Sequence, residues 1–164
     1  KEKYAGAEEE MKELAEKGRV IREKLIADIQ RDSSSFNLYM AALKMPKDTE
    51  EEKAARREAM QNGLKEAAKV PLSVAETAAE IFPLSEAAAA RGNANAVTDR
   101  LVSAMMARTA VLSALLNVKI NLSSIKDEAF RTAMESQVRR LEETASEYER
   151  KILKSSDLSA EMLK

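Results

Sequence analysis

The chain has 164 residues, 45% of them hydrophobic and 34% charged, and its 27 Lys and Arg nearly balance its 28 Asp and Glu. This composition is typical of one folded, soluble domain, and the near-neutral charge argues against nucleic acid as a partner, because phosphate-binding surfaces carry a basic excess. The chain has no cysteine and no histidine, which excludes disulfides, the usual zinc sites and histidine-activated nucleophiles.

Four Gly and three Pro in the whole chain indicate helices throughout. The first predicted helix spans residues 4–43, where apolar side chains recur every three, four or seven positions. It ends before Pro46, since the residue preceding a proline is steered out of helical geometry. Asp32 interrupts the apolar stripe between Ile29 and Phe36. Its carboxylate is expected either to bond to a neighbouring helix or to face an internal cavity, as perturbed carboxylates at functional sites do.

A turn with two lysines, Lys44 and Lys47, follows the first helix, and by itself it is interpreted as a solvated loop. Thr49 and Glu52 have the spacing of a capping box, which predicts the start of a second helix. That helix is expected to end where Val70-Pro71 interrupts it, because proline removes a backbone hydrogen bond from a helix interior.

A third, alanine-rich helix is predicted over residues 72–90, with a bend at Phe82-Pro83 and a stop at Arg91-Gly92. Glu76 is the lone charge in the first part of this segment, and it is interpreted as a rim residue more readily than as a ligand contact. Asn93 falls in the polar turn that follows, which is too short and too poor in glycine to cradle a phosphate.

Residues 101–120 are apolar on almost every side, which predicts a helix in the middle of a bundle. Arg108 and Lys119 interrupt this segment, so no membrane span is expected. A seam of polar and small residues nevertheless runs along one side of the helix: Asp99, Ser103, Ala110, Ser113, Asn117 and Asn121. Because buried polar groups need hydrogen bonds, this polar seam must meet a matching seam on a neighbouring helix or line a pocket for a polar ligand.

The last predicted helix starts at about Asp127. Its apolar face consists of Phe130, Met134, Leu141, Ala145, Tyr148 and Ile152. The elements together predict an all-α fold, an antiparallel helical bundle of one domain over residues 1–164, with a central buried helix over about residues 95–122. That helix is apolar on more sides than one small bundle covers, so self-association is expected, most simply as a homodimer.

Five segments in this order make the chain recognisable: 32–36 (DSSSF), 40–49 (MAALKMPKDT), 70–76 (VPLSVAE), 91–99 (RGNANAVTD) and 116–122 (LNVKINL). With them the chain resembles the cyclodeaminase/cyclohydrolase family of folate enzymes. That family includes the C-terminal domain of formiminotransferase-cyclodeaminase and stand-alone bacterial methenyltetrahydrofolate cyclohydrolases. It begins with a further glycine-rich helix that is absent from this sequence, so part of the site is expected to be missing as well.

The resemblance implies a one-carbon folate enzyme, which either hydrolyses 5,10-methenyltetrahydrofolate or cyclises 5-formiminotetrahydrofolate with loss of ammonia. Both reactions pass through a tetrahedral carbon between N5 and N10 of the folate and need no metal or other cofactor. Carboxylates and a lysine suffice for the proton movements. A cytoplasmic location is expected. The alternative is a non-catalytic helical interaction protein, whose polar seams only fix the register of its helices.

The catalytic residues implied by the resemblance are Asp32, Asp99 and Lys44. The two aspartates are candidates for acid–base catalysis and cation stabilisation, and as a close buried pair they would retain one proton near neutrality. Substrate binding is assigned to Lys47, Glu76, Asn93, Asn117 and Asn121. In this scheme Asn117 and Asn121 hold the pterin ring, and Lys44 or Lys47 holds the anionic glutamate tail. The aspartates and these two asparagines are expected to converge on one cleft, with Lys44 or Lys47 at its mouth.

Overall fold

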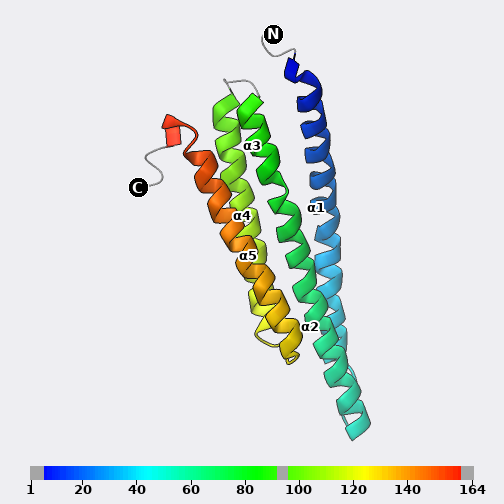
Figure 1. Ribbon diagram of the computed structural model, residues 1–164. Coiled ribbons are helices and arrows are strands. Elements are labelled where there is room, and N and C mark those ends of the chain that lie inside the picture. Colours follow the sequence, from blue (N-terminus) through cyan, green and yellow to red (C-terminus); the bar gives the residue numbers. More distant parts are fainter. Residues whose placement is uncertain (1–5, 92–95, 160–164) are drawn as a thin grey trace.

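The structure is a computed structural model that describes residues 6–91 and 96–159, and every regular element in them is helical. The helices are α1 (Glu8–Leu43), α2 (Glu50–Ala79), α3 (Ile81–Arg91), α4 (Val97–Leu122) and α5 (Glu128–Leu153). In Figure 1 the chain descends along α1, returns along α2 and α3, descends along α4 and returns along α5. The prediction of an all-α fold is confirmed.

The turn between α1 and α2 is capped as the sequence predicts. Thr49 Oγ1 accepts a hydrogen bond from the backbone N–H of Glu52 at 3.1 Å, and the Glu52 carboxylate accepts one from the Thr49 N–H at 3.1 Å. Arg56 donates from Nη2 to the carbonyl oxygen of Leu43 at 3.1 Å, which satisfies one of the free carbonyls at the end of α1. The predicted capping box is therefore confirmed.

The predicted interruption at Pro71 is wrong, because α2 continues through this residue to Ala79. Pro71 has no N–H, so the carbonyl of Ala67 loses its partner within the helix. The side chain of Asn121 on α4 replaces that partner, since its Nδ2 donates to the Ala67 carbonyl oxygen at 2.9 Å. One residue of the polar seam thus allows a proline inside the neighbouring helix.

The bend predicted at Phe82-Pro83 lies two residues earlier, at Glu80, which separates α2 from α3. Pro83 occupies the first turn of α3, where backbone N–H groups have no partner within the helix and a proline is tolerated. Phe82 is fully buried, and its ring stacks on Tyr148 of α5 with the ring centroids 5.4 Å apart.

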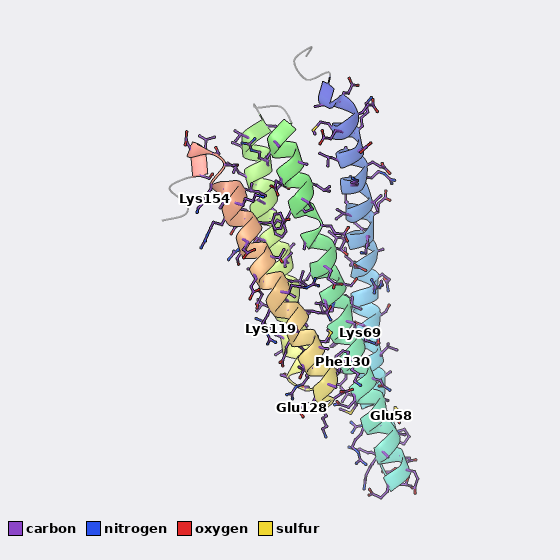
Figure 2. The ribbon with its side chains drawn as sticks, viewed as in Figure 1. Glu58, Lys69, Lys119, Glu128, Phe130 and Lys154 are labelled. Carbon is purple, nitrogen blue, oxygen red and sulfur yellow. The ribbon has the colours of Figure 1, made fainter. Side chains whose placement is uncertain are left out.

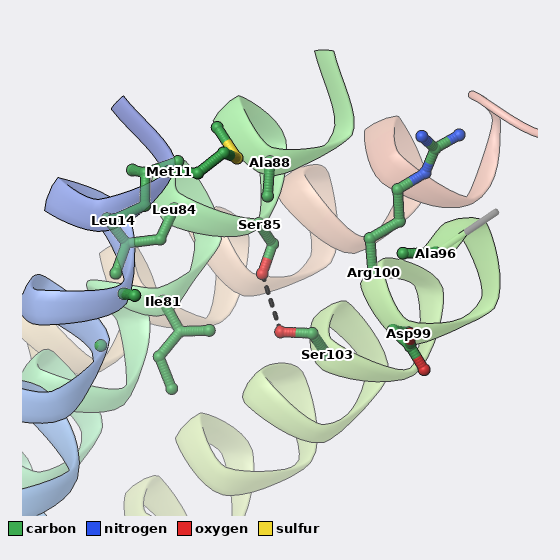
Figure 3. A pocket seen from close by; sticks show the side chains of 12 residues that line it. Met11, Leu14, Ile81, Leu84, Ser85, Ala88, Ala96, Asp99, Arg100 and Ser103 are labelled. Carbon is green, nitrogen blue, oxygen red and sulfur yellow. Dashed lines mark hydrogen bonds between the residues drawn. The ribbon is translucent and has the colours of Figure 1, made fainter. Parts of the chain in front are cut away.

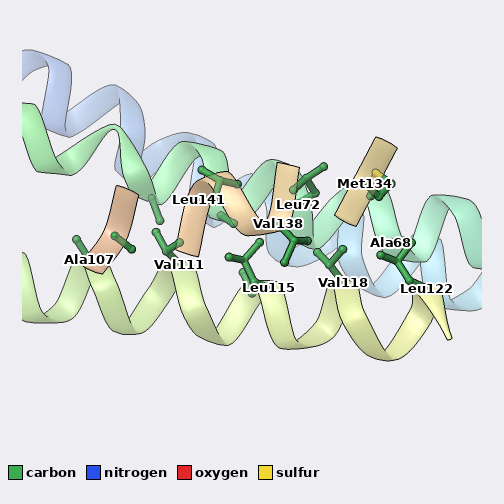
Figure 4. Close-up of a cluster of buried hydrophobic side chains, with 14 of the residues drawn as sticks. Ala68, Leu72, Ala107, Val111, Leu115, Val118, Leu122, Met134, Val138 and Leu141 are labelled. Carbon is green, nitrogen blue, oxygen red and sulfur yellow. The ribbon is translucent and has the colours of Figure 1, made fainter. Parts of the chain in front are cut away.

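The core lies between α2, α4 and α5 (Figure 4). Its larger buried side chains are Leu72, Val111, Leu115, Val118, Met134, Val138 and Leu141. The predicted apolar face of the last helix is confirmed, because Met134, Leu141, Ala145 and Ile152 are buried. Charged side chains such as Lys69, Lys119 and Glu128 stand on the outside of the bundle (Figure 2).

The apolar stripe of α1 is only partly buried, which corrects the sequence prediction. Ile29 and Phe36 are 68% and 57% exposed, and Asp32 between them is exposed as well. The buried residues of α1 instead recur every seven positions: Ile21, Asp28, Ser35 and Ala42. The face of α1 that packs on α2 is therefore rotated away from the most apolar side of the helix.

The sequence predicted that α4 is central and buried. The helix is central, but it is not buried on all sides. It packs against α2, α3 and α5, while Val102, Met106, Leu116 and Ile120 are 51–68% exposed. By length and composition alone α4 could cross a membrane, and 39% of its most apolar 18-residue stretch is buried. Core helices of soluble bundles share these properties, and the contacts of α4 are those of such a core helix.

The closest approach of α1 and α2 depends on Gly63, where a Cβ atom would lie 2.9 Å from the Tyr39 Cα. We expect Gly63→Ala to lower the free energy of unfolding by about 1–3 kcal/mol, because neither backbone can move freely. Gly18→Ala is the matched control, since nothing lies within 4 Å of that Cβ position. It should raise helix stability by up to about 1 kcal/mol. Urea denaturation measures both, and equal effects would contradict the close packing.

Asp127 caps the start of α5 and also binds α2. Its pKa is lowered, first by the hydrogen bond from Lys65 at 2.7 Å and then by the backbone N–H of Phe130 at 3.0 Å. A lowered folded-state pKa stabilises the protein above the unfolded-state value and loses that effect as the pH falls through the folded-state pKa. Asn caps helices as well as Asp. Asp127→Asn should therefore be less stable than wild type at pH 7, and the difference should shrink below about pH 4; urea midpoints at both values test this.

Candidate active site

Two hollows follow one side of α1. The first is a cavity of about 500 Å³ between α1, α3 and α4 (Figure 3). The second, of about 370 Å³, continues along α1 as far as Ile29, and the two share Gly18 and Ile81. We call the side of the molecule on which these hollows lie the α1–α4 groove; neither hollow is lined by Asp32, Asn117 or Asn121. Apolar side chains form most of the first cavity's wall: Met11, Leu14, Ile81 and Leu84.

The polar seam of α4 reaches this first cavity through Ser103. Its hydroxyl bonds to that of Ser85 on α3 at 2.8 Å, so the upper part of the seam meets a polar partner on a neighbouring helix. Asp99 also lines the cavity, but it is exposed, and its carboxylate points away from the serine pair (Figure 3). The cavity is thus mainly apolar, with a carboxylate at its rim.

Asn121 and Asp32 lie at nearly the same level of the bundle. The hydrogen bond from Asn121 to Ala67 fixes the level of α4 against α2. Gly63, one turn before Ala67, packs against Tyr39 and fixes the level of α1. Since α1 and α2 run in opposite directions (Figure 1), Asp32 lies within about 5 Å of the level of Asn121 along the bundle axis.

Asp32 also lies on the groove side of α1. It follows Ile29 by three residues, and residues three or four apart share one face of a helix. The other side of α1 carries Lys24, which pairs with Glu80 of α2 at 3.8 Å. Asn117 lies one turn from Asn121 on α4, at the level of Asp32. We call these three residues the Asp32 cluster: Asp32, Asn117 and Asn121.

The Asp32 cluster has polar atoms free to bind a ligand. The side-chain amides of its asparagines are held in place, since Asn117 Nδ2 donates to the Ser113 carbonyl at 3.3 Å and Asn121 Nδ2 donates to Ala67. In the described part of the chain, both amide oxygens and the Asp32 carboxylate make no hydrogen bond. Asp32 and Asn117 are exposed and Asn121 is half-buried. The cluster therefore offers two amide acceptors from α4 and one carboxylate from α1 at the same level of the bundle axis.

The other predicted site residues lie elsewhere. Asp99 lies 22 residues before Asn121 on α4, about 33 Å along the helix, so the expected convergence of Asp99 with Asp32 does not occur within one chain. Glu76 is exposed one turn before Glu80, on the side of α2 opposite the groove. Exposed Lys44 and Lys47 lie beyond the end of α1, about 18 Å or more from Asp32. Asn93 lies outside the described residues.

The sequence interpretation missed a second carboxylate, Asp28, one turn before Asp32. It is 2% exposed, its Oδ1 accepts a hydrogen bond from Arg31, and its Oδ2 is buried without a partner. The residues buried with it include Ser35 and Ala42, which are not large apolar side chains, so hydrophobic periodicity gave no signal for its burial. Within residues 6–91 and 96–159, no group of three acidic side chains is placed to hold a metal ion.

Comparison with known proteins identifies the fold. The formiminotransferase-cyclodeaminase family matches residues 1–140 of the chain. The chain belongs to this family. A solved member, the formiminotetrahydrofolate cyclodeaminase of Thermotoga maritima, superposes with a TM-score of 0.82 at 30% identity, over 94% of this chain and 73% of that one. The resemblance inferred from the sequence motifs is confirmed.

Two characterised family members are more similar in sequence. The methenyltetrahydrofolate cyclohydrolase of Methylorubrum extorquens is 38% identical over 130 residues, which is 79% of this chain and 62% of the enzyme. The formimidoyltransferase-cyclodeaminase of Sus scrofa is 38% identical over 115 residues, or 70% of this chain. The match spans 21% of that longer protein. The family members similar to this chain thus include enzymes with two different named activities.

Proposed function

We propose that the protein is a one-carbon folate enzyme that hydrolyses 5,10-methenyltetrahydrofolate or cyclises 5-formiminotetrahydrofolate with loss of ammonia. Family membership supports the substrate class. The observation that carries the proposal is the Asp32 cluster, which places a carboxylate of α1 and two amide oxygens of α4 at one level along the bundle axis. Those groups suit a ligand that is cationic at its reacting carbon and presents N–H donors along a pterin edge.

In this proposal Asp32 holds the cationic one-carbon unit and moves a proton as the tetrahedral carbon forms or collapses. Acid–base catalysis of this kind contributes about 10²–10⁴-fold in other enzymes. The amide oxygens of Asn117 and Asn121 accept hydrogen bonds from the pterin. The chemistry needs no metal or redox cofactor, and we place the protein in the cytoplasm, where folates and their partner enzymes meet.

We also propose that the protein is a homodimer of antiparallel bundles. The exposed apolar side chains of α1 and α4 support this, because apolar surface left in contact with water favours association. A dimer that covers this surface would also remove water from the Asp32 cluster. Low local polarity strengthens the interaction between a carboxylate and a cationic substrate.

Parallel assays test the activity and its class. Loss of the methenyl chromophore is followed with 5,10-methenyltetrahydrofolate, and ammonia release is followed with 5-formiminotetrahydrofolate. Catalysis of either reaction supports the proposal, and their relative kcat/KM assigns the class. If neither reaction is catalysed and neither folate raises the melting temperature, the helical interaction protein is the better description, because a ligand of the folded state must stabilise it.

A substitution at Lys47 tests whether this residue binds the glutamate tail of the folate. Lys47→Ala should raise KM for a polyglutamylated folate, with kcat little changed, because it removes attraction common to ground and transition states. The KM for a monoglutamate should change less. Lys53→Ala is the matched control, since its ammonium group is engaged by Glu50 at 2.7 Å. Equal changes for both folates would argue against a role for Lys47 on the tail.

A further inference from the structure

The side chain of Gln61 on α2 holds the turn between α4 and α5 at two points. Its Nε2 donates to the carbonyl oxygen of Ser124 at 3.1 Å, and its Oε1 accepts a hydrogen bond from the backbone N–H of Lys126 at 2.7 Å. Ser124 and Lys126 are exposed, so water could satisfy these backbone groups without Gln61. The two bonds therefore do more to fix the position of the turn than to satisfy buried groups.

Two further contacts join the same stretch of α2 to the ends of α4 and α5. Lys65, one turn after Gln61, donates to Asp127 Oδ2 at 2.7 Å, and its ammonium group lies 5.5 Å from the centre of the Phe130 ring. The carbonyl oxygen of Ala67 accepts the bond from Asn121 at 2.9 Å. The three attachment points on α2 lie within about 9 Å along the helix. Residues 61–67 thus hold the end of α4 and the start of α5 together.

Residues 61–67 also contact α1, through Gly63. A Cβ atom at Gly63 would lie 2.9 Å from the Cα of Tyr39, so the two helix backbones are in close contact. Asp32 on α1 and Asn121 on α4 therefore take their levels along the bundle axis from one short segment of α2. Hydrogen bonds fix such a level more specifically than apolar packing does, because they are directional and the hydrophobic effect is not.

We propose that Gln61 is a positioning residue of the candidate site, which holds the end of α4 on α2 and thereby keeps the Asn121 amide at the level of Asp32. Gln61 does not contact the ligand in this proposal, because the α4–α5 turn engages both polar atoms of its side chain. The inference rests on the proposed function for the role of Asn121 in folate binding. The effect of Gln61 on the position of Asn121 does not depend on that function.

Gln61→Ala should raise KM for the folate by about 5–10-fold with kcat little changed. A displaced Asn121 loses a hydrogen bond to the pterin that is common to the ground and transition states. The melting temperature should fall by only about 2–4 °C, because water can bond to the exposed backbone groups of the turn. Asn62→Ala is the matched control, since Asn62 is the next residue of α2, is exposed and makes no hydrogen bond within the described residues. Its KM should equal that of wild type.

A double-mutant cycle separates positioning from a purely structural role. If Gln61 acts through Asn121, Gln61→Ala should raise KM no further in a chain that already carries Asn121→Ala, although it should still lower the melting temperature. An equal rise of KM in both backgrounds would overturn the positioning role. An unchanged KM in Gln61→Ala alone would overturn it as well, and would leave the proposed function in place.

The side-chain amide of Asn121 reports its own displacement without any assay of activity. In the folded chain its Nδ2 donates to two carbonyl oxygens, those of Ala67 and Asn117, both at 2.9 Å. Its proton resonances are assigned by their absence from the spectrum of Asn121→Ala. Gln61→Ala should shift these resonances and Asn62→Ala should not; unshifted resonances in Gln61→Ala would overturn the inference. If they shift but the wild-type protein turns over neither folate, the proposed function fails and the hold of Gln61 on Asn121 is supported.

Discussion

Asp32→Asn should lower kcat by about 100-fold or more while KM for the folate changes little. The substitution keeps the size and polarity of the side chain but removes the negative charge and the ability to take up a proton. Asp32 is exposed on α1 and makes no hydrogen bond within the described chain, so the variant should fold with an unchanged melting temperature. Stopped-flow measurement of methenyl loss, or of ammonia release, checks the prediction.

Glu143→Gln is the matched control for Asp32→Asn. It neutralises a carboxylate that is also exposed but lies on α5, away from the α1–α4 groove. Turnover of this control should equal that of wild type. Wild-type turnover in Asp32→Asn and in Asp99→Asn would show that the chemistry uses other groups.

Asp28→Leu should raise the free energy of unfolding and leave activity unchanged, whereas Asp32→Asn should lower activity and leave stability unchanged. Asp28 is 2% exposed, and one of its carboxylate oxygens is buried without a donor. The Arg31 side chain is 54% exposed and stays hydrated without its partner, so an apolar residue at 28 removes only the cost of burying an unpaired carboxylate oxygen, about 1–3 kcal/mol. A gain of this kind raises the melting temperature of a domain this size by about 2–4 °C per kcal/mol.

Asp28→Asn separates the effect of charge from that of burial. It keeps a polar group in the same buried position and replaces the charged partner of Arg31 by a neutral acceptor, so it should be less stable than Asp28→Leu. Folate turnover should stay at the wild-type level in both variants, because Asp28 lies on the face of α1 that packs against α2. A loss of stability in Asp28→Leu would mean that both oxygens of the Asp28 carboxylate have hydrogen-bond donors in solution.

Features that depend only on residues close together in the sequence could be predicted from it. The capping box of Thr49 and Glu52 and the cap at Asp127 need only a few residues of backbone, and the structure contains both. The predicted end of the helix at Pro71 was wrong because it depends on a residue far away in the sequence. The carbonyl that this proline leaves free finds its donor in Asn121, 50 residues further along the chain, and no local rule contains that contact.

The sequence named candidate site residues, but it could not predict how they are arranged in space. Helical spacing placed Asn117 and Asn121 on one line with Asp99, which is correct for their direction around α4. It could not place Asp32 at the level of the asparagines and far from Asp99, because that depends on how far α1 and α4 are offset along the bundle axis. The burial of Asp28 in place of Ile29 shows the same gap, since periodicity does not say which side of a helix its neighbours cover.

The bond between Asn121 and the carbonyl freed by Pro71 makes two distant positions dependent on each other. In a chain with alanine at position 71, the Ala67 carbonyl would bond within α2, and Asn121 Nδ2 would keep one acceptor, the carbonyl oxygen of Asn117 at 2.9 Å. With proline at 71, two carbonyl oxygens hold the nitrogen of this amide. We therefore expect the effects of Pro71→Ala and Asn121→Ala to be non-additive in a double-mutant cycle. In that sense the proline helps to set the orientation of a side chain on the neighbouring helix.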